Sequence, residues 1–177
     1  MNVAEYFALI DERLRENGYG AALCDARAQE VDYVYHAESS FKLSRLNGLD
    51  TYFVLKQLSV AAYLDSIRQF IARALGASRD DRVQRHRRKM RAMTTYAVLV
   101  GESFPEEVER FIARYPENAN QRVVMTSTVP FPILADVASE RLIYRTSSPQ
   151  WGAVAYRSIR SEAARYLGVF GGAPWPQ

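Results

Sequence analysis

The stretch that decides the fold is residues 50–75, DTYFVLKQLSVAAYLDSIRQFIARAL, in which the spacing of apolar residues changes from strand-like to helix-like. Its first part, Asp50 to Leu58, is rich in the aromatic and β-branched residues that strands favour. From Ser59 onward the apolar residues recur every three or four positions, as on one face of a helix, and Gly76 is a suitable helix end. The stretch therefore predicts a strand followed by a helix.

The same two spacings extend toward the N-terminus and toward the middle of the chain. Residues 3–14 carry a helical stripe, and residues 21–24 and 31–46 read as two strands that precede a turn at Asn47-Gly48. After Gly76 we expect a separate basic helix from about Arg79 to Met93. Residues 96–100 form a near-continuous apolar run, which is typical of a strand buried on both faces in the middle of a sheet.

The C-terminal half continues with alternating elements. Residues 103–106 carry a helix-capping pattern, and that helix should end near Pro116. We expect a strand over 122–128, a short edge strand over 142–144 and a last helix from Ser148. The segment Val129-Pro130-Phe131-Pro132 should not lie inside a sheet, because neither proline can donate a ladder hydrogen bond.

Length and composition indicate one soluble domain. The chain has 177 residues, of which 48% are hydrophobic, enough for a single core. We predict a single α/β domain over residues 1–172, with a central mixed β-sheet flanked by helices in the order α-β-β-β-α-(α)-β-α-β-α, and a C-terminal tail over 173–177. We find no membrane span and no export signal, so we expect a cytoplasmic protein.

The positive charge is concentrated in one short segment. Between Arg79 and Arg91 seven Lys or Arg stand against two Asp, so this segment carries +5 whereas the whole chain carries +3. Such a segment attracts phosphate backbones through counterion release. It can equally be a solvated helix face that pairs with acids elsewhere. The candidate nucleic-acid-binding residues are Arg79, Arg82, Arg85, His86, Arg87, Arg88, Lys89 and Arg91.

The element order over about residues 3–100, helix, three strands, helix, strand, resembles the core of the PD-(D/E)XK nuclease-like superfamily, which includes restriction endonucleases. In that family an acid on the second strand and an acid-x-Lys motif on the third hold Mg²⁺. The resemblance implies Asp32 as the first acid and Lys56 as the lysine. Val54 stands where the second acid belongs, and valine cannot ligate Mg²⁺.

The sequence offers two substitutes for the missing acid, namely Asp50 and the carboxylates near Asp32. Asp50 shares a strand face with Lys56, but six residues of strand separate them by about 20 Å. A one-metal site built from Asp32 with Glu30 or Glu38 is conceivable, although carboxylates in a polar strand region are more often plain surface. We therefore interpret Asp32 and Lys56 as a vestigial catalytic pair, and expect no cofactor unless the domain is an active Mg²⁺-dependent nuclease.

Other features suggest different functions. Cys24 and His36 might be taken for a nucleophile and its base, but a lone cysteine in an apolar run is more often buried; a single cysteine also excludes a disulfide framework, and no zinc-ligand spacing is present. The aromatic residues Phe131, Phe170 and Trp175 lie on irregular segments, where we expect them to be exposed and to fold back or dock on a partner.

Three functional hypotheses follow. The leading one is a nuclease-like domain without competent catalysis that binds nucleic acid through the basic helix within a larger assembly. The alternative is an interaction or scaffold protein that forms a homodimer, or binds another protein, through a sheet edge and the aromatic tail. The third is a metal-dependent nuclease with a rearranged site.

Overall fold

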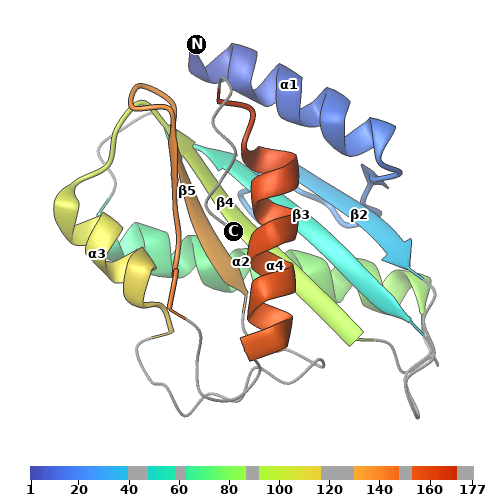
Figure 1. The fold of residues 1–177 in the computed structure, drawn as a ribbon. Coiled ribbons are helices and arrows are strands. Elements are labelled where there is room, and N and C mark those ends of the chain that lie inside the picture. Colours follow the sequence, from blue (N-terminus) through green and yellow to red (C-terminus); the bar gives the residue numbers. More distant parts are fainter. Residues whose placement is uncertain (40–47, 59–62, 87–91, 117–129, 148–152, 171–177) are drawn as a thin grey trace.

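The fold is described by a computed structural model that covers residues 1–39, 48–58, 63–86, 92–116, 130–147 and 153–170 (Figure 1). The helices of this part of the chain are α1 (Val3–Glu16), α2 (Leu64–Arg85), α3 (Glu106–Arg114) and α4 (Ala153–Leu167). The strands are β1 (Gly20–Ala21), β2 (Tyr33–Ser39), β3 (Leu49–Gln57), β4 (Ala92–Gly101), β5 (Phe131–Asp136) and β6 (Arg141–Ile143).

The strands pair in chain order into one sheet. β1 pairs antiparallel with β2, and β2 pairs antiparallel with β3. The β3–β4 and β4–β5 pairs are parallel, and β6 returns antiparallel to β5. The connection from β3 to β4 runs through α2, as a parallel crossover requires. The structure confirms the predicted α/β class with a mixed sheet flanked by helices.

β4 lies in the middle of the sheet, as its apolar sequence predicted. It pairs with β3 on one side and with β5 on the other. Nine of its ten residues are buried, and only Thr94 is partly exposed. A strand with both faces covered can carry few polar residues, because a buried polar group needs a hydrogen-bond partner.

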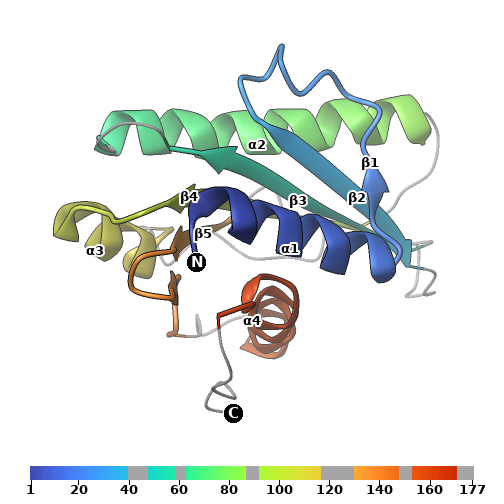
Figure 2. The ribbon, with the colours of Figure 1, turned by 90° about the horizontal axis from the view of Figure 1, so that it is seen from above.

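Helices cover both faces of the sheet. Figures 1 and 2 show α1 and α4 on one face and α2 on the other. The first core contains Tyr6 from α1, Phe53 and Tyr96 from the sheet, and Leu167 from α4. A second core packs α2 and α3 against the opposite face of the sheet. None of the helices in the described residues is long and apolar enough to cross a bilayer.

α1 forms where its sequence predicts it. Tyr6, Ile10 and Leu14 recur every four residues and are fully buried against the sheet and α4. At its start, the side chain of Asn2 accepts a hydrogen bond from the Glu5 backbone N–H, and the Glu5 carboxylate accepts one from the Asn2 backbone N–H. This reciprocal cap satisfies two donors that the first turn leaves without partners.

The prediction of two helices divided at Gly76 is wrong. α2 runs without interruption from Leu64 to Arg85, so Gly76 lies inside it, and Met93 belongs to β4. Glycine lowers the stability of a helix by about 1 kcal/mol but does not end one that is held by tertiary packing. Here Ala74 and Ala77, on either side of Gly76, are fully buried against the sheet.

Replacing Gly76 with alanine is therefore expected to raise the free energy of unfolding by about 0.5–1 kcal/mol. A Cβ at this position would meet only the Gln29 side chain, whose Oε1 would lie 3.3 Å away at the end of a flexible chain. Urea denaturation measures the change. Gly18→Ala is the control of opposite sign, because Gly18 has φ +84° and alanine is strained there. Destabilisation by Gly76→Ala would mean that Gln29 cannot move aside.

The expectation that residues 129–132 avoid the sheet is also wrong. Phe131 and Pro132 begin β5, and Pro132 lies opposite Ala97 of β4. β6 joins β5 only from Leu134 onward, so the sheet has a local edge at Pro132 where no ladder donor is needed on the outer side. At Pro132, β5 is therefore an edge strand that tolerates proline, and from Leu134 onward it is paired on both sides.

Two of the three aromatic residues expected on irregular segments, Phe131 and Phe170, fold back onto the core, which is one of the two expected alternatives. Phe131 is buried in the first core, and the ring of Phe170 stacks on Tyr6 with 5.0 Å between ring centroids. Both rings pack against apolar side chains of the first core. The predicted strand over 122–128, the start of the last helix at Ser148, Trp175 and the tail over 173–177 lie outside the described residues.

Candidate functional site

Asp32 and Lys56 lie together at the end of the β2–β3 pair, but both make hydrogen bonds to the backbone. The Asp32 carboxylate accepts a hydrogen bond of 2.6 Å from the Gln57 N–H, and Lys56 Nζ donates one of 2.8 Å to the Glu30 carbonyl oxygen. Glu30 has a left-handed backbone (φ 52°), and its carboxylate pairs with Arg73. These contacts fasten the loop before β2 to β3 and α2.

Asp32 also lines an open groove between α1 and β2, with a volume of about 880 Å³. Phe7 and Tyr33 form part of its wall, with their ring centroids 5.5 Å apart. Three of its four charged side chains are engaged within the chain, because Arg15 pairs with Asp11 at 2.7 Å and Asp32 accepts from the backbone; Arg27 is the fourth. The groove therefore offers no concentrated charge to a ligand.

The first four residues of the predicted basic surface lie at the end of α2, and they divide into two kinds. Arg79 is exposed and Arg82 is half-buried, whereas the side chains of Arg85 and His86 are only 23% and 10% exposed and lie against the sheet. Arg87, Arg88, Lys89 and Arg91 lie outside the described residues. The basic segment thus has an inward-facing part that sequence periodicity did not reveal.

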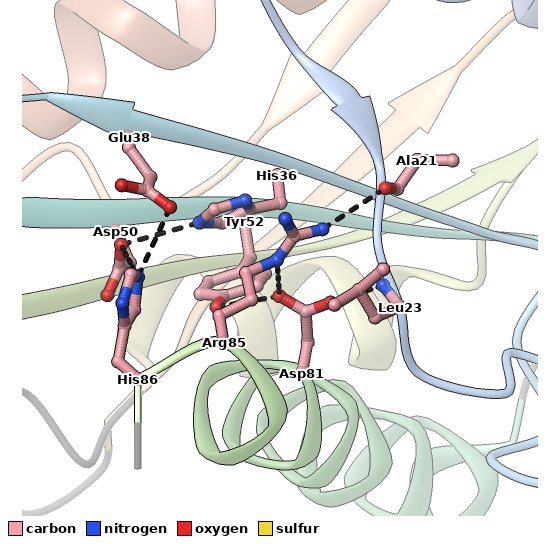
Figure 3. A network of polar contacts seen from close by, with 9 residues as sticks. All are labelled: Ala21, Leu23, His36, Glu38, Asp50, Tyr52, Asp81, Arg85 and His86. Carbon is pink, nitrogen blue, oxygen red and sulfur yellow. Dashed lines mark hydrogen bonds and ion pairs between the residues drawn. The ribbon is translucent and has the colours of Figure 1, made fainter. Parts of the chain in front are cut away.

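Arg85 belongs to a polar network that joins α2 to the sheet (Figure 3). Its Nε donates a hydrogen bond of 2.7 Å to Asp81, a fully buried carboxylate that also accepts from the Tyr52 hydroxyl at 3.0 Å and from the Leu23 N–H. The Arg85 guanidinium further donates to the Ala21 carbonyl at 3.3 Å. A buried carboxylate is tolerable only when its oxygens are satisfied in this way.

A second group of polar side chains lies beside this network and contains both histidines of the sequence. His36 Nε2 lies 3.4 Å from an Asp50 carboxylate oxygen, and His86 Nε2 lies 3.5 Å from the same oxygen and 3.2 Å from Glu38 (Figure 3). We call His36, Glu38, Asp50 and His86 the histidine–carboxylate cluster. It is buried except at Glu38, whose side chain is 44% exposed.

Sequence reasoning missed this cluster because its members come from three elements. Glu38 and Asp50 are direct partners in the β2–β3 ladder, and His36 lies two residues before Glu38 on the same face. His86 follows the last residue of α2. The His-x-Glu spacing on a strand was the one available signal, but pairing it with Asp50 required the register of β2 and β3.

The interpretation of Cys24 as a nucleophile has no support in its surroundings. Partial burial, and next the nearby Asp81 carboxylate, raise the pKa of the Cys24 thiol to about 11. A thiol that stays protonated near neutral pH is a poor nucleophile. His36, its supposed base, contacts Asp50.

The chain matches no family model, and comparisons with curated proteins and with solved structures give no match either.

Proposed function

We propose that the chain is a nucleic-acid-associated, nuclease-like domain that binds the phosphate backbone through the end of α2 and the basic residues that follow it. The element order and strand pairing support the nuclease-like part of the proposal. A helix, three antiparallel strands, a crossover helix and a parallel strand occur in that order from α1 to β4. The element order is the feature on which the resemblance rests.

The observation that carries the binding proposal is the distribution of charge at the end of α2. Of the two acids in the basic segment, Asp81 is fully buried and its charge is balanced internally by Arg85. Asp80 remains exposed and accepts a hydrogen bond from Gln29. Arg79 and Arg82 therefore present positive charge to solvent with little local compensation, next to the four further cations of residues 87–91.

The proposed domain binds nucleic acid but does not cleave it, because Asp32 and Lys56 do not form a catalytic site. Val54 takes the place of the second acid, and the two polar side chains hold the loop before β2. A carboxylate that accepts from a backbone N–H can still ligate a metal, but one carboxylate beside a valine gives Mg²⁺ too few oxygen ligands.

Replacing Arg79 and Arg82 with alanine is expected to weaken binding to a labelled DNA duplex and to lower its salt dependence. Each lost phosphate contact lowers the slope of log K against log salt by about one, so the double variant should lose about two. Fluorescence anisotropy at increasing KCl measures both quantities. An RNA duplex and single strands of equal length define which nucleic acid is preferred.

The matched control is Arg110→Ala with Arg114→Ala, which removes the same charge from exposed positions on α3. This variant should bind like the native chain. The binding proposal is wrong if the native chain does not bind at low salt, or if the two double variants lose affinity equally. Mg²⁺-dependent cleavage that Lys56→Ala abolishes would contradict the absence of catalysis.

A further inference from the structure

The histidine–carboxylate cluster is assembled with the donor types and spacing of a metal site. Three of its members, His36, Glu38 and Asp50, each offer a ligand atom, and these atoms all lie within 4.8 Å of one another. His86 brings a second imidazole nitrogen within 3.5 Å of both carboxylates. The ligand atoms of His36, Glu38 and Asp50 therefore form one group, and His86 lies beside that group in contact with its two carboxylates.

The distances agree with four-coordinate geometry. Zinc binds nitrogen and oxygen ligands at about 2.0–2.1 Å, which places the ligand atoms of a tetrahedral site about 3.3 Å apart. In the cluster the His36–Asp50 pair is 3.4 Å apart, the His86–Glu38 pair 3.2 Å and the His86–Asp50 pair 3.5 Å. The ligand atoms of His36, Glu38 and Asp50 lie within 4.8 Å of one another, so binding of an ion would draw these side chains closer together.

An independent observation concerns the Nε2 atom of His86. The side chain is nine-tenths buried and aimed at Glu38 and Asp50 (Figure 3), yet within the described part of the chain this atom makes no hydrogen bond. A buried imidazole nitrogen usually has a hydrogen-bond partner or a metal. A cation between His86 and the two carboxylates would satisfy this nitrogen.

We propose that His36, Glu38, Asp50 and His86 bind one divalent transition-metal ion, with Zn²⁺ as the preferred ion. Imidazole ligands favour zinc and similar metals over Mg²⁺, which prefers oxygen ligands alone. The site is distinct from the Asp32–Lys56 pair, because Asp50 and Lys56 lie at opposite ends of β3. The ion joins β2, β3 and the end of α2, directly before the basic residues 87–91.

This inference does not rest on nucleic-acid binding and is tested without nucleic acid. Full-length chain without a histidine tag is treated with a chelator, dialysed and titrated with ZnCl₂ by calorimetry. We expect one ion per chain. Titration with CoCl₂ provides a spectroscopic reading, because Co²⁺ in a tetrahedral site of nitrogen and oxygen ligands absorbs visible light far more strongly than hydrated Co²⁺.

His86→Gln and Glu38→Gln are the informative variants, because Glu38 is the exposed member of the cluster, His86 lies just past the end of α2, and glutamine is close in size to both side chains. Each is expected to weaken Zn²⁺ binding by at least about tenfold. Glu12→Gln, an exposed carboxylate on α1, is the matched control and should bind like the native chain. Circular dichroism shows that each variant is folded.

Three results would overturn the proposal. The native chain could show neither heat of binding nor a Co²⁺ spectrum, which would leave the cluster as direct contacts between the imidazoles and the carboxylates. Folded His86→Gln and Glu38→Gln could both retain native affinity. The Glu12→Gln control could lose as much affinity as the cluster variants, which would indicate nonspecific surface binding.

Discussion

Above pH 10 the protein is expected to lose at least about 4 kcal/mol of stability for each further pH unit, because three fully buried tyrosines, together with the buried Tyr19 and Tyr35, ionise only after unfolding. Tyr6, Tyr52 and Tyr96 are each fully buried, and burial raises the pKa of each phenol well above its ordinary value near 10. The carboxylates of Asp81 and Glu162 raise the pKa values of Tyr52 and Tyr96 further. A raised folded-state pKa contributes stability that is complete below pH 10 and is lost as pH rises.

The hydrogen bonds explain why these phenols stay protonated. The Tyr6 hydroxyl donates to the Leu167 carbonyl at 2.9 Å, and the Tyr96 hydroxyl donates to the Glu162 carboxylate at 2.6 Å. A phenolate could not donate either bond and would face an oxygen at close range. A domain with the usual 5–15 kcal/mol of stability should therefore unfold between about pH 11 and pH 14.

Phenolate absorbance and circular dichroism, recorded together against pH, test this expectation. Ionisation of the buried tyrosines should coincide with loss of the circular dichroism signal. Tyr33→Phe and Tyr63→Phe serve as controls and should leave the unfolding midpoint unchanged. Ionisation of all tyrosines near pH 10 in a chain that remains folded would show that the three phenols are not protected.

Replacing Asp81 with alanine is expected to lower the free energy of unfolding by about 3 kcal/mol, the usual effect of removing one partner from a buried ion pair. The change leaves the Arg85 guanidinium, the Tyr52 hydroxyl and the Leu23 N–H without their acceptor. It also removes the contacts that fix α2 to β3 and to the loop after β1. Urea denaturation at neutral pH gives the difference.

The neighbouring Asp80 provides the matched control. It is exposed and accepts a hydrogen bond of 2.9 Å from the Gln29 side chain, so Asp80→Ala should cost less than about 1 kcal/mol. Equal effects of the two alanine variants would mean that the buried network contributes no more than a surface contact does.

Periodicity was sufficient to predict the central elements of the fold. The apolar run over 96–100 predicted a central strand, and the stripe in residues 3–14 predicted α1, because burial of those residues determines both patterns. The predictions at Gly76 and Pro132 are wrong because the backbone preference of a single residue does not decide where a packed helix or strand ends. Packing of Ala74 and Ala77 on the sheet, and the late start of β6, decided the outcome at those positions.

The polar sites were harder to predict than the fold. Which acidic side chains lie close together depends on the register of the strands and on where a helix ends. Local sequence determines neither of these. Asp50 was set aside because it is far from Lys56, although it lies opposite Glu38. His86 was assigned to a solvent-facing cationic surface, whereas its side chain turns toward the sheet.

α2 spans about 33 Å at 1.5 Å per residue, and it is held by charged contacts at two separate points along its length. Arg73 pairs with Glu30 near its middle. Near its end Asp81 accepts a hydrogen bond from Tyr52 of β3, and Arg85 donates one to the Ala21 carbonyl. The direction in which the helix delivers the chain to residues 87–91 is thus set during folding. Because α2 is already oriented in the free protein, the proposed binding of a polyanion would not include the loss of entropy that orienting this helix would otherwise cost.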